Sequence, residues 1–409
     1  MHSIPDLVFS RAVLPNTRGG ALFHTIYDVR EEKAVCLAPA TLATKYGVEE
    51  RNSQSVVTVQ NRFTRQRTFW NAQRTAKPQS FAAAAKLEDP TSGRGCDFCS
   101  FQTLTATDTW GRVENEHCVT ASNLFKITRN HGLVLFKHHE PLAFSLEQLG
   151  GLLDAAQKWV HNTHAACPEA LHPLLMWNSG PRSGASQYHG HAQMVLTETP
   201  LPDLERRQAA ALAFAARGND ATSMAPAEDG AMPSVAAVPS ASAAFEQACA
   251  EAHAALGLRR VLRLPSANGH GDDLAWVYHE TQPLKDMDTI VVGTAIDSPA
   301  FIALMHCALR TLIDRCGVMT FNVSVTGFSL APPPAGEATQ QQPAELGRVV
   351  ARLVSRGKVT SLASDYGALE VFTGASIGHT SPWRLAAELD AEALSRGWTL
   401  HAGEGCVYD

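Results

Sequence analysis

The sequence predicts an α+β protein made of two similar halves, each an antiparallel sheet with packed helices. Residues 124–196 have the pattern of strands, a long helix and a further pair of strands, and this order recurs over 260–330. Between them, the Ala-, Pro- and Ser-rich composition of 219–243 is typical of a linker or surface insertion. The 409 residues suffice for two such units. We therefore expect an N-terminal half, an insertion or linker, and a C-terminal half at 1–203, 204–243 and 244–409.

The elements of the first half follow from local patterns. SVVTVQ (55–60) and GLVLF (132–136) are runs of strand length bounded by polar residues. Residues 145–166 place apolar side chains at helical spacing after Ser145, which is a typical N-cap. In chain order we expect a strand at 55–60, a basic and aromatic loop at 61–78, a second loop at 90–117, two short strands within 124–140, a helix at 145–166, and paired strands at 173–180 and 188–196.

The second half repeats this alternation after the linker. Its apolar runs are again of strand length, and they flank one long segment with helical spacing. In chain order we expect a helix at 204–218, the linker, a helix near 244–257, strands at 260–264, 274–279 and 288–294, a helix at about 298–316, a strand within 318–330 and a loop at 331–345.

Composition excludes several classes of function. A net charge of −6 predicts no general attraction to nucleic acid or to an anionic membrane surface. No apolar run approaches the length of a membrane span, and residues 1–15 lack the basic start and apolar core of a secretory signal. The nine cysteines are scattered except for one close pair, which indicates a reducing compartment. We expect a cytoplasmic protein without a membrane or nucleic-acid partner.

The stretch from Asn178 to Gln193 holds the strongest chemical signal. On a strand, alternate residues point to one face, so His189, His191 and Gln193 would share a face. The preceding loop contains two glycines and two serines, which bring backbone N–H groups and hydroxyls close to a phosphate. An isolated His-x-His pair is more often structural or metal-binding, but the loop and the alternating glutamine make this run far more specific.

These residue types suit the transfer of a phosphoryl-linked group. A neutral imidazole is a good nucleophile near pH 7, so we expect His191 to carry the group covalently. Gln193 can donate a hydrogen bond to a phosphoryl oxygen without acting as an acid or base. The Ser186 hydroxyl and nearby backbone donors can stabilise charge on the transferring phosphorus.

The run resembles the active-site sequence of the galactose-1-phosphate uridylyltransferase branch of the histidine triad superfamily. Diadenosine tetraphosphate phosphorylases carry a closely related run. The resemblance implies two tandem histidine-triad-like halves, with His191 as the nucleophile and Gln193 as the residue that holds the phosphoryl group. Hydrolases of the superfamily have a third histidine at the position of Gln193, so the glutamine favours transfer or phosphorolysis over hydrolysis.

The same resemblance supplies candidate substrate-binding residues. Upstream, Asn123-Leu-Phe125 resembles an Asn-x-Phe that packs on the base and ribose, and 69–78 resembles a basic segment that contacts phosphates. In the second half, 348–374 resembles a segment that approaches the sugar, while Val349-Val350-Ala351-Arg352 replaces a second His-x-His and makes a second metal site doubtful. The candidates are Asn178, Asn123, Phe125, Arg74 with Lys77, Arg182, Gln187, and Glu370 with Asp365.

A zinc site is predicted close to the nucleophile. Cys96-x-x-Cys99 has the spacing of a zinc knuckle, and a closed site needs two further ligands. The uridylyltransferase pattern implies His139 and His189, which gives a structural zinc that holds the strand carrying His191. His138 is an alternative to His139. Two reduced cysteines without a metal remain the simplest alternative, and His189 would then orient the loop instead.

The resemblance implies transfer of a nucleoside monophosphate from a nucleotide sugar to a sugar 1-phosphate or phosphate acceptor. A dinucleoside tetraphosphate phosphorylase is the nearest alternative and shares the covalent intermediate. A non-catalytic nucleotide-binding protein of the same fold, a nucleotide hydrolase and a metal chaperone are further alternatives. The uridylyltransferase resemblance also implies a homodimer.

Overall fold

The computed structural model describes residues 17–75, 89, 95–217, 238–265, 272–332, 348–357 and 364–402. Helices and largely antiparallel strands alternate through these residues, so the expected α+β class is confirmed. No helix within these ranges is long and apolar enough to cross a membrane. The division at 203 and 243 stays a prediction, because much of the predicted linker lies outside the described residues.

The helical elements of the described chain are α2 (Arg18–Ile26), α3 (Ala40–Tyr46), α4 (Ala72–Thr75), α5 (Phe101–Leu104), α6 (Leu146–Ala166), η1 (Pro181–Ser183), α7 (Pro202–Arg217), α8 (Val238–Ala254), α9 (Pro299–Arg310), η3 (Thr311–Arg315), α10 (Ala368–Thr373) and α11 (Pro382–Ser395).

Its strands are β1 (Tyr27–Leu37), β2 (Arg51–Asn61), β3 (Arg67–Trp70), β4 (Cys118–Ser122), β5 (Asn130–Phe136), β6 (His172–Ser179), β7 (His191–Thr197), β8 (Arg259–Pro265), β9 (Asp272–His279), β10 (Thr289–Gly293), β11 (Phe321–Thr326), β12 (Val349–Ser355), β13 (Ser376–Gly378) and β14 (His401–Ala402).

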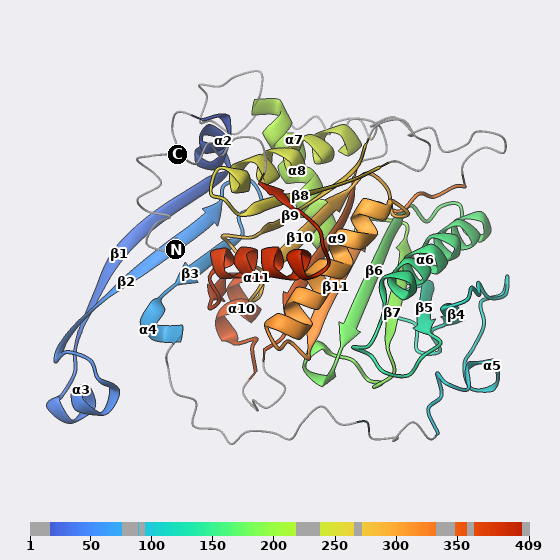
Figure 1. Cartoon of the computed structure of the whole chain (residues 1–409), viewed down its shortest axis with the longest axis horizontal. Helices are drawn as coiled ribbons and strands as arrows, with labels where there is room; N and C mark the ends of the chain where they lie inside the picture. The colour runs from blue at the N-terminus through green and yellow to red at the C-terminus, as the bar shows by residue number, and fades with distance from the viewer. Residues whose placement is uncertain are drawn as a thin grey trace.

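A ten-stranded sheet contains the internal repeat. Its order is β14-β8-β9-β10-β12-β11-β6-β7-β5-β4. The first half contributes β4-β5-β7-β6 with α6 between β5 and β6 in sequence, and the second contributes β9-β10-β12-β11 with α9 between β10 and β11. The two sets meet where β6 pairs antiparallel with β11, so the strands of both halves form one continuous sheet (Figure 1).

One face of this sheet is covered by α6 and α9, which lie side by side across it, and by α11 (Figure 1). Trp159 of α6 and Phe301 of α9 are buried there against Trp177 and Phe321 of the two central strands. Helix α6 begins as predicted, because the Ser145 side chain and Gln148 form a reciprocal capping box. Burial of these aromatic rings provides much of the hydrophobic stabilisation that fixes the central strands.

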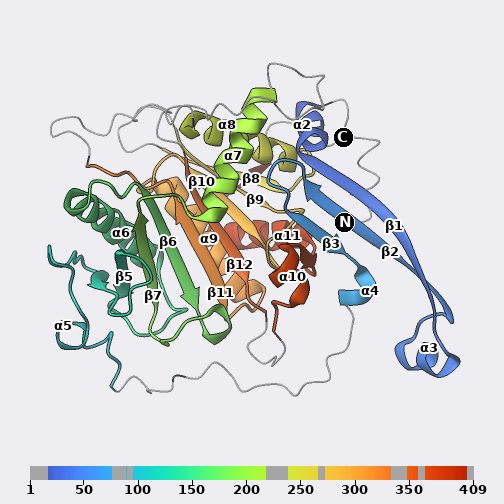
Figure 2. The same ribbon diagram turned by 180° about the vertical axis from the view of Figure 1, so that it is seen from behind.

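The opposite face is covered only towards its two ends. At one end, residues around Phe98 and Phe101 cover an apolar cluster on β4 and β5. At the other end, α2, α7 and α8 cover Trp276 and Tyr278 of β9 (Figure 2). Between these covers, half-buried side chains of β6 and β11 form a central strip, namely Met176, Asn178, Asn322 and Ser324. The registers place His191 and Gln193 on this same face.

A second, four-stranded sheet has the order β1-β2-β3-β13. Strands β1 and β2 form a long hairpin that carries α3 at its tip and projects from the body (Figures 1 and 2). The expected loop at 61–78 is wrong, because β3 and α4 lie within it. Strand β3 pairs with β2 and β13, and the Trp70 indole donates a hydrogen bond to the Thr281 carbonyl, a long-range contact invisible to local patterns.

The expected strand pair within 124–140 is also corrected. Only β5 forms there, and its antiparallel partner on the edge side is β4, which lies earlier in the chain. Residues 123–129 instead form a loop because Asn123 accepts a hydrogen bond from the Phe125 backbone, and His131 accepts one from the Ile127 backbone.

Candidate active site and metal centre

His191 is the first residue of β7 and is only 4% exposed. Its Nδ1 lies 2.8 Å from the His189 carbonyl oxygen. Because a carbonyl can only accept, Nδ1 carries the proton and Nε2 keeps its lone pair. Burial lowers the pKa of His191 below its usual value, which favours the neutral ring. The geometry therefore presents Nε2 as a nucleophilic nitrogen.

Gly190 allows the two histidines to sit where they do. A Cβ at this position would lie 3.0 Å from the Phe136 ring and 3.1 Å from the Pro141 Cα. Only a glycine therefore fits without displacing either neighbour. Strand β5 and the segment after it can then pack closely against the start of β7.

Gln193 is oriented by His131, a residue that sequence reasoning missed. The Ile127 backbone N–H donates to His131 Nδ1 over 3.1 Å, so His131 Nε2 carries the ring proton in the neutral form. That nitrogen lies 2.9 Å from Gln193 Oε1 and donates to it. Burial lowers the pKa of His131, consistent with a neutral ring. Within the described chain Gln193 Nε2 makes no hydrogen bond, so it faces the strip as a donor.

Asn178 lies on β6, the strand that pairs with β7, which begins with His191. The antiparallel pairing of β6 with β7 ends at Met176 and Gln193, and the same register continued by two residues would bring Asn178 level with His191. Asn178 Oδ1 accepts a hydrogen bond of 2.6 Å from Asn322 Nδ2 of β11. A side chain from the second half is therefore in direct contact with the predicted site.

The loop between β6 and β7 carries three other predicted residues. Ser186 is exposed and Gln187 is half-buried. Arg182 bends away towards the second half, where its Nε donates to the Arg356 carbonyl over 2.8 Å and its Nη2 lies 3.8 Å from Asp365. The catalytic role predicted for Ser186 and the substrate-binding roles predicted for Arg182 and Gln187 stay predictions.

Four side chains are arranged as a metal site. The ligand atoms of Cys96, Cys99, His139 and His189 all lie within 4.8 Å of one another. His189 Nδ1 is 3.5 Å from Cys96 Sγ and 3.4 Å from Cys99 Sγ, and His139 Nδ1 is 3.3 Å from Cys99 Sγ. Two sulfurs and two imidazole nitrogens converging on one point are the donor set of a closed tetrahedral zinc site. The cluster can thus hold a metal ion.

The Nε2 atoms of His139 and His189, which point away from the cluster, also have polar partners. His189 Nε2 donates to the Phe136 carbonyl over 2.6 Å, and His139 Nε2 lies 3.0 Å from an Asp89 carboxylate oxygen. Such partners fix the tautomer that leaves Nδ1 free as a ligand. His138 packs on the Phe136 ring instead, 4.9 Å between centroids, and is not part of the cluster found among the described residues.

Phe98 links the metal cluster to the nucleophile. It lies between Cys96 and Cys99, and its ring meets His191 edge-on with centroids 5.0 Å apart. The same ring lies 5.7 Å from His189. Closing the knuckle around an ion therefore also fixes one wall of the nucleophile's surroundings.

The remaining predicted substrate residues are dispersed. Asn123 lies beside the site, with its amide nitrogen 3.1 Å from His131 Nε2. Phe125 is 83% exposed on the neighbouring loop, where a flat ring could cover a base. Arg74 belongs to α4, and Lys77 lies outside the described residues.

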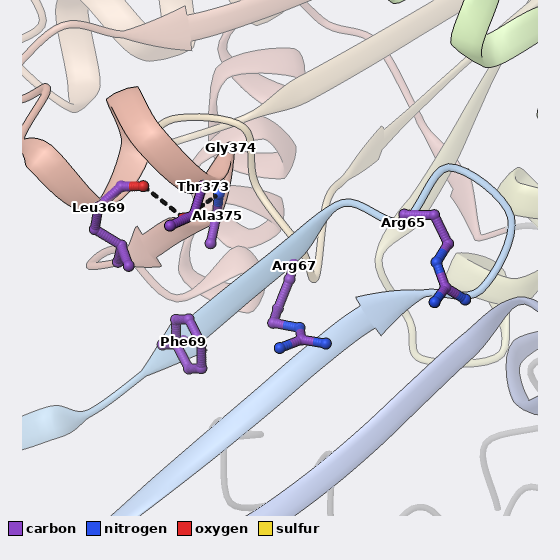
Figure 3. Close-up of a pocket in the computed structure, with 7 residues that line it drawn as sticks. All are labelled: Arg65, Arg67, Phe69, Leu369, Thr373, Gly374 and Ala375. Carbon is purple, nitrogen blue, oxygen red and sulfur yellow. Dashed lines mark hydrogen bonds between the residues drawn. The ribbon is translucent and has the colours of Figure 1, made fainter.

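Glu370, predicted to contact sugar, lies in α10 rather than on a strand. It accepts from the Gly367 backbone as part of the helix cap, 4.0 Å from the Lys285 ammonium. A hollow of about 330 Å³ adjoins this helix, against β3 (Figure 3). Arg65, Arg67 and Phe69 line one side of it, and Leu369 and Thr373 the other. No residue of the histidine motif lines this hollow, so it is separate from the reactive nitrogen.

The second half has a buried ion pair at Arg352, in the segment that replaces a second His-x-His. Arg352 of β12 is 8% exposed and Asp288 is 1% exposed. Arg352 Nε donates to both Asp288 carboxylate oxygens, at 2.9 and 3.1 Å, and Arg352 Nη2 donates to Asp288 Oδ2 as well. These three hydrogen bonds offset the cost of burying the two charges. The only metal-like cluster found among the described residues is the one in the first half.

No protein-family model and no curated protein sequence matches the chain. Among solved structures, an ADP-glucose phosphorylase from Arabidopsis thaliana with bound ADP-glucose is 14% identical, with a TM-score of 0.53 over 81% of this chain and 97% of that one. The chain has the fold of that phosphorylase. This likeness agrees with the expected α+β fold.

Two further structures align with much of the chain. A GalT-like protein from Arabidopsis thaliana is 15% identical over 72% of this chain and 91% of its own, with a TM-score of 0.47. A uridylyltransferase is 11% identical over 82% and 98%, also with a TM-score of 0.47. At these identities the likeness concerns the fold, and the chemistry has to be argued from the residues.

Proposed function

We propose that the protein is a nucleotidyltransferase in which His191 carries a nucleoside monophosphate between a nucleotide sugar and a sugar 1-phosphate or phosphate. The observation that carries this proposal is the His191 ring, which is buried and neutral, with Nδ1 fixed by the His189 carbonyl and Nε2 left free. A structural zinc histidine would use a nitrogen for the metal, but His191 is outside the cluster.

The reaction is a double displacement. Nε2 of His191 attacks the α-phosphorus of the donor, a phosphorus–nitrogen bond forms, and the bond to the leaving phosphate or sugar phosphate breaks. The acceptor's phosphate oxygen then attacks the same phosphorus and frees the imidazole. The amide nitrogens of Gln193 and Asn178 donate to the phosphoryl oxygens, and the Ser186 hydroxyl of the preceding loop is the third donor. These donors stabilise the charge that develops in the transition state.

Zinc fits the cluster of Cys96, Cys99, His139 and His189. A bound ion there would hold the start of β7 and would leave no open position for water, so its contribution is structural. Phe98, between the two cysteines, would transmit that rigidity to the His191 ring.

Intact-protein mass spectrometry tests the proposal directly. The protein is mixed separately with UDP-glucose, ADP-glucose, GDP-sugars and diadenosine tetraphosphate, with His191→Ala as the matched control. We expect an adduct of one nucleoside monophosphate that is absent from His191→Ala and is removed by the acceptor. Nucleotide binding without an adduct from any donor would contradict the proposal and favour a nucleotide-binding protein.

The neighbour with a TM-score above one half supports the choice of donor. That phosphorylase was solved with ADP-glucose, so ADP-glucose with phosphate as acceptor is the first pair to assay. An adduct from diadenosine tetraphosphate alone would instead identify a dinucleoside tetraphosphate phosphorylase. The homodimer implied by the uridylyltransferase resemblance is proposed as well, and sedimentation equilibrium tests it.

A further inference from the structure

A chain of hydrogen bonds runs from the second half into the nucleotide site. Arg356 follows β12 and its Nη1 donates to Asn322 Oδ1 over 2.6 Å. Asn322 Nδ2 donates to Asn178 Oδ1 over 2.6 Å, and also to the Ser183 carbonyl over 3.0 Å. Asn178 lies two residues beyond the last pair of β6 with β7, towards the His191 end of β7, so this relay ends at the predicted site.

The relay has a fixed direction because it starts at a guanidinium. Arginine has only donors, so Asn322 must turn its oxygen towards Arg356. Its amide nitrogen, which can only donate, then faces Asn178 and the Ser183 carbonyl. Asn178 must therefore turn its oxygen towards Asn322. This leaves Asn178 Nδ2 directed away from the relay, with no hydrogen bond to the described residues.

The guanidinium itself is held in place. Arg356 Nε and Nη2 donate to the two Asp365 carboxylate oxygens, at 2.8 and 3.2 Å. Its own carbonyl accepts from Arg182 Nε, which belongs to the loop between β6 and β7. All of these side chains are half-buried, where a charge-assisted hydrogen bond is stronger than on an open surface.

We propose that Asn322 and Arg356 are positioning residues of the second half, which set the amide of Asn178 as a hydrogen-bond donor to the transferring phosphoryl group. Without the relay, Asn178 can flip and present its oxygen, which repels a phosphoryl oxygen. The inference rests on the nucleotidyl-transfer function proposed above. It assigns a role in the reaction to a half that lacks the histidine motif.

Asn322→Asp is the sharpest test because it reverses the relay without changing size. The carboxylate still pairs with Arg356 but can only accept, so Asn178 must turn its nitrogen towards Asp and its oxygen towards the substrate. We expect the rate of His191 adduct formation in a single turnover to fall about 100-fold, as in Asn178→Ala, because one phosphoryl donor is lost in both. Nucleotide affinity should change far less than the rate.

Two further comparisons between variants distinguish an effect on the orientation of Asn178 from an effect of added charge or of lost stability. Ser324→Asp places the same charge two residues along the same face of β11, and its effect on the rate should be much smaller. Arg356→Lys keeps a donor-only group and should retain more activity than Arg356→Gln, whose amide fits either orientation. Melting temperatures of all variants report any loss of folding.

A double-mutant cycle gives the deciding result. If Asn322 acts through Asn178, Asn322→Asp in the Asn178→Ala background adds little further loss. Multiplicative losses, or equal losses for Asn322→Asp and Ser324→Asp, would overturn the inference. Absence of any adduct in the unmodified protein is a different outcome, because it contradicts the proposed function itself and not the relay alone.

Discussion

At the scale of single residues, three side chains of the site each have one polar atom hydrogen-bonded to a partner that can act only as a donor or only as an acceptor. The His189 carbonyl fixes His191, the His131 ring fixes Gln193, and the Asn322 amide fixes Asn178. What remains exposed to a substrate is one imidazole lone pair and two amide donors. A phosphorus atom with negatively charged oxygens is the centre that this set of atoms complements.

His131 provides a prediction of its own. His131→Leu removes the donor to Gln193 Oε1, so the Gln193 amide can rotate and its nitrogen is no longer held towards the phosphoryl group. We expect the single-turnover rate of adduct formation to fall roughly tenfold or more, because a lost hydrogen bond of about 1.4 kcal/mol corresponds to a factor of ten.

His131→Gln is the matched variant, since its amide nitrogen can replace His131 Nε2 as the donor. It should keep a larger part of the rate than His131→Leu, at equal melting temperature. If the two substitutions slow adduct formation equally, His131 does not support the reaction by orienting Gln193.

Local sequence patterns predicted the site residues that lie close together in the sequence and form recognisable motifs. His191 and Gln193 follow from alternation on one strand, and the cysteine pair follows from its knuckle spacing. His131, Asn322 and Arg356 were missed for a physical reason. Asn322 contacts Asn178 across 144 positions of sequence, and only the pairing of β6 with β11 brings the two amides together.

At the scale of elements, prediction succeeded where periodicity and caps were strong. Helix α6 was expected at 145–166 and spans Leu146–Ala166, and β10 was expected at 288–294 and spans Thr289–Gly293. It failed for β3, which is only four residues long, with two polar residues followed by two aromatic ones. Such a strand exists because β2 and β13 flank it, and no local signal encodes those partners.

The segment that contains Cys96 and Cys99 allows a prediction about zinc content. Cys99→Ser removes one of four ligands and Cys36→Ser removes an exposed cysteine on β1, so they form a matched pair. Elemental analysis should give about one zinc per chain for the unmodified protein and for Cys36→Ser, and much less for Cys99→Ser.

The loss of zinc should have a second consequence. Phe98 lies between the two cysteines and packs on His191, so loosening the knuckle in Cys99→Ser should also slow adduct formation and lower the melting temperature. Full zinc content in Cys99→Ser would show that these four side chains are not the site.

At the scale of the whole molecule, the continuous sheet makes the two halves one structural unit. The helix-covered core runs without a break from Val134 of β5 to Val277 of β9. The relay from Arg356 to Asn178 crosses the same junction. We expect the halves to unfold together, because removing either one would expose the apolar faces of β6 or β11.

Two buried histidines outside the metal cluster make the stability of this unit depend on pH. Burial lowers the pKa of His279 to about 3, and burial with the nearby Arg396 guanidinium lowers that of His306 to about 4. In the unfolded chain both titrate near 6.5. Below pH 6.5 the unfolded state therefore binds protons that the folded state does not, so stability is full above pH 6.5 and falls as the pH decreases towards 4. Each histidine contributes a loss of about 1.4 kcal/mol per pH unit in that window.

His306→Gln tests this dependence. His306 accepts from Arg396 at Nδ1 and donates to the Phe144 carbonyl at Nε2, and an amide can make only part of both contacts, so some stability is lost at pH 7.5. The decisive quantity is the slope. Urea unfolding between pH 7.5 and 4.5 should show a shallower loss of stability in His306→Gln than in the unmodified protein, because one proton-binding difference has been removed. His401→Gln, which changes an exposed ring, should keep the original slope. Equal slopes in all three proteins would mean that His306 takes up its proton in the folded state as readily as in the unfolded one.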